Sequence, residues 1–143
     1  MVIDEHVIFY RDGGCFAMSA ALHRLTGYPE RCIDFGNCTH AFVVTASGAV
    51  LDVHGEHTWG EFLRFLVSEG SLLPESVASG KVKYMPIPGE DSIEWRDRGY
   101  KPPTETAIRK AISVAKKHSN LLDSLSLHMM KASKAGSTMN PRL

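Results

Sequence analysis

A glycine-flanked amphipathic segment near the start constrains this chain more than any other feature. Two glycines lead into Cys15, and apolar residues then recur at the spacing of one buried helix face. Gly27 stands where a helix C-terminus favours a left-handed residue, and Pro29 blocks continuation. The sequence therefore predicts a helix that begins at Cys15 and ends before Gly27. Its expected buried face consists of Met18, Ala21, Leu22 and Leu25.

The predicted helix holds the Cys15 thiol in its first turn. Backbone N–H groups point out of that end, and the helix dipole is positive there. Such a position favours thiolate over thiol and can lower the pKa of a cysteine from its free value of about 8.5. The glycines also let a substrate approach the backbone. A small buried cysteine that only packs under a helix start is the alternative interpretation.

Two β-rich runs, residues 40–45 and 49–54, flank a three-residue connection that ends in Gly48. This pattern is typical of a β-hairpin whose glycine takes the left-handed position. Asp52 would then lie diagonal to His40 on one face of the sheet, whereas a two-residue turn would move Asp52 to the other face. The three-residue loop pairs Thr45 with Ala49, Phe42 with Asp52, and His40 with His54.

A cysteine that opens a helix, a histidine that opens a strand and an aspartate on the next strand resemble the papain-like cysteine hydrolases. The nearest resemblance is to small bacterial and phage members: cell-wall endopeptidases and amidases, leader-peptide-processing peptidases and glutamine deamidases. It spans about residues 10–70 and implies Cys15 as nucleophile, His40 as its acid–base partner and Asp52 as the residue that orients the imidazole. The implied fold is α+β: a papain-like core with the cysteine helix on a small antiparallel sheet, plus extra C-terminal helices.

Many of these relatives hold the oxyanion with a Gln a few residues before the cysteine, but this chain contains no Gln. We therefore expect backbone N–H groups around Gly14 and the cysteine to hold it, assisted by Tyr10, Asn37 or His6.

Together these features predict thiol-dependent hydrolysis of a peptide, isopeptide or Gln side-chain amide, with a protein or peptide substrate and no cofactor. Hydrolysis, deamidation and transglutamination stay open at this point. The alternative belongs to another class: a non-catalytic binding or inhibitor protein on the same scaffold, which acts by occlusion of a partner. A reactive Cys15 favours the enzyme, and a buried, unreactive Cys15 favours the binding protein.

The length of 143 residues and the hydrophobic content of 43% suit a single domain. We expect this domain at 1–132, with a core at about 10–87 and a helical part at about 104–132, followed by a disordered basic tail at 133–143.

The formal net charge is +0, which gives no reason to expect nucleic acid or a membrane as a partner. The charges are uneven, because residues 1–100 hold 8 Lys/Arg and 14 Asp/Glu, whereas residues 101–143 hold 8 and 2. The chain is therefore acidic over residues 1–100 and basic over residues 101–143.

Three cysteines, an N-terminus without a basic region and no long apolar run favour a cytoplasmic protein over a secreted or membrane-spanning one. We expect no metal. The zinc alternative lacks the usual C-x2-4-C spacing, since five residues separate Cys32 and Cys38. Its candidate ligands are Cys32, Cys38, His40, His54 and His57.

The remaining elements follow from shorter signals. Thr58 and Glu61 form a capping box for a second helix that ends at Gly70. Residues 28–39 are interpreted as a linker that forms a lip of the active-site cleft. Residues 81–87 alternate like a strand whose Pro86 indicates an edge. From Thr104 the pattern predicts two helices with a break at Ser119-Asn120, or one kinked helix.

Overall fold

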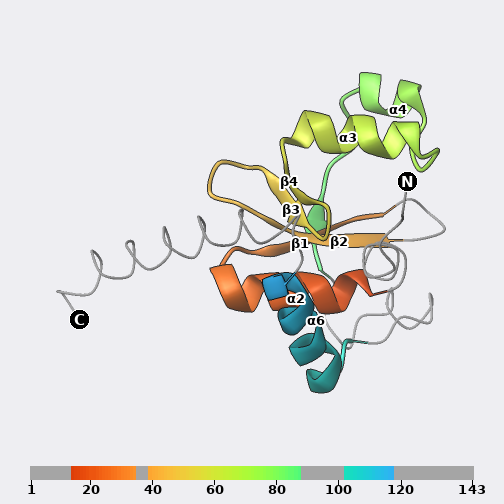
Figure 1. Ribbon diagram of the computed structural model, residues 1–143. Helices are drawn as coiled ribbons and strands as arrows, with labels where there is room; N and C mark the ends of the chain where they lie inside the picture. Colours follow the sequence, from red (N-terminus) through yellow and green to blue (C-terminus); the bar gives the residue numbers. More distant parts are fainter. Residues whose placement is uncertain (1–13, 35–38, 88–101, 118–143) are drawn as a thin grey trace.

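Helices cover both faces of one antiparallel sheet in the computed structural model, which describes residues 14–34, 39–87 and 102–117. The expected α+β class is therefore confirmed (Figure 1). The elements are α2 (Cys15–Thr26), β1 (Glu30–Asp34), β2 (Thr39–Val44), β3 (Val50–Asp52), β4 (Gly55–His57), α3 (Trp59–Ser68), α4 (Pro74–Ala78), β5 (Met85–Pro86) and α6 (Glu105–Lys117). The predicted break at Ser119-Asn120, the helix after it and the tail at 133–143 lie outside the described residues.

The hairpin between β2 and β3 has the predicted three-residue loop and register. Val44 pairs with Val50, and the Thr45 N–H donates to the Ala49 carbonyl over 2.9 Å. Gly48 takes the left-handed conformation with φ of 87°, which a glycine adopts at little steric cost. This register brings Asp52 to the strand position opposite Phe42.

The second strand of the hairpin is shorter than predicted. β3 ends at Asp52, the chain turns at Val53 and His54, and β4 returns along β3 with Gly55 opposite Asp52. The expectation of a strand to residue 54, with His54 opposite His40, is therefore wrong. The physical reason is a tight turn: Gly55 has φ of 102°, and the Asp52 carboxylate accepts from the His54 N–H over 2.9 Å.

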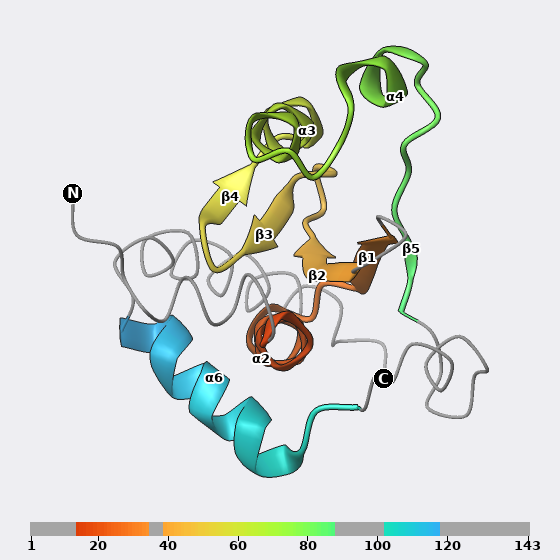
Figure 2. The same cartoon turned by 90° about the vertical axis from the view of Figure 1, so that its right-hand side faces the viewer.

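The five strands lie in the order β4-β3-β2-β1-β5, which Figure 2 shows nearly end-on. The interpretation of residues 28–39 as a linker is wrong for 30–34, since β1 pairs with β2 on one side and β5 on the other. Both Cys32 and Ile33 are buried, and a strand buried on both faces shows no alternation. The strand predicted at 81–87 is confined to β5, which is an edge strand as Pro86 indicated.

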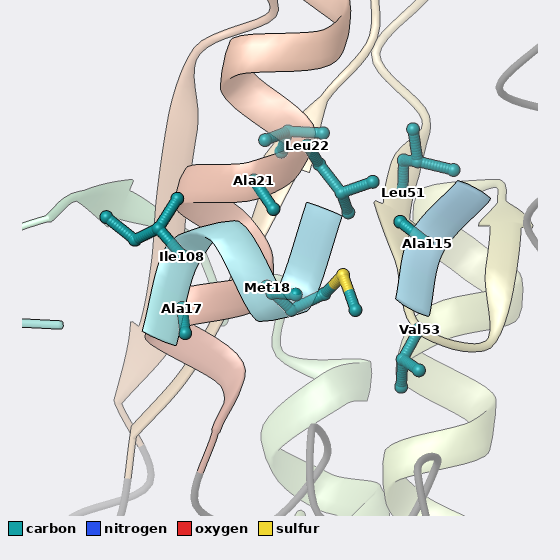
Figure 3. Packing of buried hydrophobic residues seen from close by; sticks show 10 residues of the cluster. Ala17, Met18, Ala21, Leu22, Leu51, Val53, Ile108 and Ala115 are labelled. Carbon is teal, nitrogen blue, oxygen red and sulfur yellow. The ribbon is translucent and has the colours of Figure 1, made fainter. Parts of the chain in front are cut away.

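α2 and α6 lie on one face of the sheet (Figure 2). Their contact is a core of small and branched side chains, in which Met18 and Leu22 of α2 face Leu51 of β3 (Figure 3). The predicted bounds of α2 hold, because Gly27 has φ of 78° and its N–H donates to the His23 carbonyl. From α6 this core receives Ile108, Ala111 and Ala115.

α3 covers the other face of the sheet (Figure 1). The predicted capping box is present: the Glu61 N–H donates to the Thr58 hydroxyl over 3.1 Å, and the Glu61 carboxylate accepts from the Thr58 N–H over 2.8 Å. Phe62, in the apolar stripe of α3, packs against the sheet. The short helix α4, which begins at Pro74, was not predicted. In the described ranges, no helix has both the length and the apolar character that a bilayer crossing needs.

Truncation of Leu22 tests the core shared by α2, the sheet and α6. Leu22 is fully buried, whereas Leu73 is 66% exposed. We expect Leu22→Ala to lower the free energy of unfolding by about 2–5 kcal/mol, because the substitution leaves a cavity. Leu73→Ala is the matched control and should change it by less than about 0.5 kcal/mol. Urea denaturation measures both, and equal losses would contradict this packing.

Candidate active site

The fold puts Cys15 at the first position of α2, as the sequence predicted. Gly14 is the N-cap and offers no side chain to bond the free N–H groups of the first turn, which also carries no acidic residue. This end of the helix therefore keeps its positive character. The thiol itself is 3% exposed and donates to the Thr39 carbonyl over 3.7 Å.

His40 and Asp52 form a buried pair across the hairpin. The Nε2 atom of His40 lies 3.0 Å from the Oδ2 atom of Asp52, and the two residues are 7% and 2% exposed. The three-residue loop makes this contact, because it brings both side chains to one face in a diagonal arrangement. The other carboxylate oxygen, Oδ1, accepts from the His54 N–H, so both oxygens of Asp52 are bonded.

Electrostatics favour the charged forms of both partners. Burial alone lowers the pKa of His40, but hydrogen bonding and charge at Asp52 and Cys15 outweigh it and raise the pKa to about 10. Burial raises the pKa of Asp52, yet the bond to His40 and the charges of His40 and His54 give a net lowering. At neutral pH the pair is therefore an imidazolium and a carboxylate.

The thiol and the imidazole approach each other from opposite faces of the sheet. Cys15 packs with Cys32 and Ala41 below β2, whereas the ring of His40 stacks on Phe62 of α3 with centroids 5.9 Å apart. They come together at the start of β2, where the sulfur contacts the carbonyl of Thr39, the residue before His40. The influence of Cys15 on the pKa of His40 follows from this proximity.

His54 lies beside the pair but faces away from it. Its ring packs on Phe65 with centroids 5.0 Å apart, and its buried Nε2 atom has no hydrogen-bond partner among the described residues. Burial lowers its pKa, although the charge of Asp52 opposes this. His54 therefore bonds Asp52 through its backbone N–H, and its side chain acts on Asp52 only through its charge.

The three residues predicted for catalysis are thus brought together, and Gly14 adjoins them. Tyr10, Asn37 and His6 lie outside the described residues, as does Cys38. Sequence reasoning missed the contacts of Thr39 and Phe62. Phe62 was assigned to the buried stripe of α3, but no local signal connects that stripe to a histidine twenty-two residues earlier.

The described segments contain no group of three or more His, Cys, Asp and Glu side chains that could hold a metal ion. Cys32 is fully buried between β2 and β5, and its thiol contacts the Pro86 carbonyl at 3.8 Å.

Comparison of the chain with protein-family models, curated proteins and solved structures found no match. The case for a function therefore rests on the geometry of the site.

The ion pair makes stability depend on pH with a defined sign. The pKa of His40 is raised from 6.5 to about 10, so its contribution is fully present below about pH 6.5 and is lost as the pH rises toward 10. The pKa of Asp52 is lowered, so its contribution is present above its usual value of 3.8 and is lost as the pH falls. We expect the free energy of unfolding, measured with urea, to decline between pH 6.5 and 10 by up to about 1.4 kcal/mol per pH unit.

Asp52→Asn supplies the control for this decline. The variant removes the charge that holds the proton on His40, so the decline should become shallower. NMR titration of the imidazole in the wild type should show a pKa for His40 far above 6.5. Titration of His40 near 6.5 would contradict the ion pair.

Proposed function

We propose that this protein is a thiol-dependent amide hydrolase with Cys15, His40 and Asp52 as its catalytic triad. The observation that carries the proposal is the buried 3.0 Å contact between His40 and Asp52, next to a thiol in the first turn of a helix. Perturbed, mutually bonded groups of this kind are typical of catalytic sites. We further propose that the α+β fold is a papain-like one, and that the protein acts in the cytoplasm on a protein or peptide.

In the proposed reaction, the Cys15 thiolate attacks the carbonyl carbon of an amide, and a C–S bond forms. The His40 imidazolium then gives its proton to the amide nitrogen, the C–N bond breaks, and the amine leaves. Water attacks the resulting thioester, gives its proton to the neutral imidazole and releases the acid and the thiolate. Asp52 keeps the imidazole oriented and stabilises its charge throughout.

The oxyanion of the tetrahedral intermediate needs hydrogen-bond donors. In this proposal they are the backbone N–H groups at the start of α2, which lack a capping side chain at Gly14. The positive end of the helix dipole adds to their effect. A chain without Gln can therefore stabilise the oxyanion with its backbone alone.

The burial of Cys15 favours the alternative, a non-catalytic protein on the same scaffold that acts by occlusion of a partner. A thiol that is 3% exposed and bonded to a backbone carbonyl suits a structural cysteine. The two functions differ in what they require of the sulfur, because only the hydrolase needs a reactive thiolate.

Removal of single triad members tests the hydrolase as a unit. We expect Cys15→Ala to abolish release of fluorescence from an internally quenched peptide library and release of ammonia from Gln-containing peptides, a loss of at least about 10³-fold. His40→Ala should lose nearly as much. Asp52→Asn should lose less, because it removes orientation and charge rather than a reacting group.

His57→Ala is the matched histidine control and should keep most of the activity, because His57 lies on β4 outside the triad. Full activity in a folded Cys15→Ala variant would refute the role of Cys15 as nucleophile, whereas a wild type without activity in either assay would leave the binding protein. Peptide cleavage and ammonia release separate peptidase from deamidase.

Thiol reactivity separates the two proposed functions without a substrate. We expect iodoacetamide to alkylate Cys15 faster than Cys32 near neutral pH, because only Cys15 combines a helix N-terminus with a histidine neighbour. Both thiols are buried, so Cys32 is a matched internal control. Mass spectrometry of tryptic peptides gives both rates, and His40→Ala should reduce the difference, because only the helix N-terminus then remains. Equal rates in the wild type would favour the binding protein.

A further inference from the structure

A cavity of about 400 Å³ lies between β1, α4 and the chain that follows α4. Figure 2 shows α4 and this segment above the β1 side of the sheet, which is the side that α3 also covers. The cavity is lined by Ile33, Leu72, Ser76, Ser79, Lys81, Val82 and Lys83.

The floor of the cavity adjoins the candidate catalytic histidine. Ile33 pairs directly with His40 across β1 and β2, and side chains opposite each other have Cβ atoms about 5 Å apart on the same face. Ile33 also belongs to the apolar cluster around Phe62, on which the ring of His40 stacks. The cavity therefore lies beside the imidazole of His40, on the same face of the sheet.

The rim of the cavity is basic and its floor is apolar. Lys81 and Lys83 are exposed, and neither forms an ion pair with a carboxylate of the described residues. Lys81 and Lys83 are the only basic residues of the segment 65–87. Apolar contacts from Leu72 and Val82 suit the methylene groups of a side chain, and ammonium groups suit a carboxylate at its end. A glutamate side chain has both parts.

We propose that this cavity binds an acidic residue, preferably glutamate, on the amine side of the amide that is cleaved. The inference rests on the proposed function, in which His40 protonates the leaving amine, and on the pairing of Ile33 with His40, which puts the cavity beside the residue that gives this proton. The substrate class is thus a peptide in which glutamate follows the scissile amide.

Two matched affinity reagents test this preference. N-chloroacetyl-glutamate α-amide and N-chloroacetyl-glutamine α-amide differ only in the charge of one side chain on the amine side of an amide. The Cys15 thiolate displaces chloride from either reagent: an S–C bond forms, the C–Cl bond breaks and chloride leaves. Rates at low ionic strength are measured by mass spectrometry on the 143-residue chain, with Cys32 as internal reference.

We expect the glutamate reagent to label Cys15 about fivefold faster than the glutamine reagent, the size of effect that two exposed ion pairs give. The difference should shrink at high salt. The double variant Lys81→Ala, Lys83→Ala should abolish it. The control Lys110→Ala, Lys116→Ala removes the same charge from exposed positions of α6 and should retain it.

The outcomes separate the two proposals. Equal rates for both reagents in the wild type, or a glutamate preference that survives loss of Lys81 and Lys83, would overturn the inference and leave the hydrolase intact. If neither reagent labels Cys15 faster than Cys32, the hydrolase fails and the inference fails with it.

Discussion

The register between β2 and β3 is the constraint on which the rest of the site depends. Gly48 closes a three-residue loop in the left-handed conformation, and this loop puts His40 and Asp52 on the same face. A slip by one residue would turn Asp52 to the α2 face and leave two buried groups without partners, at a cost of several kcal/mol. The same slip would withdraw Val50 from its contact with α3. Hydrophobic packing and the ion pair therefore select one register together.

Burial of an ion pair costs free energy because both charges lose their hydration, so the presence of one in this core needs an explanation. Well-packed hydrophobic residues often stabilise a core as well as a buried pair does or better, whereas loss of one partner costs about 3–5 kcal/mol. Stability alone thus gives little cause to keep His40 and Asp52 in the core. The proposed catalysis gives a cause, because the ring of Phe62 packs on the imidazole and a bond shielded from water holds the imidazolium more firmly in place.

The helix at Cys15, the hairpin loop and the capping box at Thr58 were predictable because each is encoded by residues a few positions apart. β1 was not, because a strand buried on both faces has no alternation, and its strand character depends on its neighbours β2 and β5. The diagonal between His40 and Asp52 followed from loop length. The stacking of His40 on Phe62 and the cavity beside Ile33 come from tertiary packing, for which the chain carries no short-range signal.

The arrangement of these parts gives the site a particular electrical character. Cys15 lies on the α2 face of the sheet and His40 on the α3 face, so in the proposed hydrolase an amide that meets both approaches the end of β2 at Thr39. β1 reaches the same end, since Asp34 pairs with Thr39. Two sources of positive potential adjoin this end, the start of α2 and the two lysines of the cavity, whereas the charge of the imidazolium is balanced by the Asp52 carboxylate. In the proposed hydrolase, these charges favour an anionic substrate over a cationic one at this end of the sheet. Selection by the proposed hydrolase therefore begins with charge, before any contact with the reacting atoms.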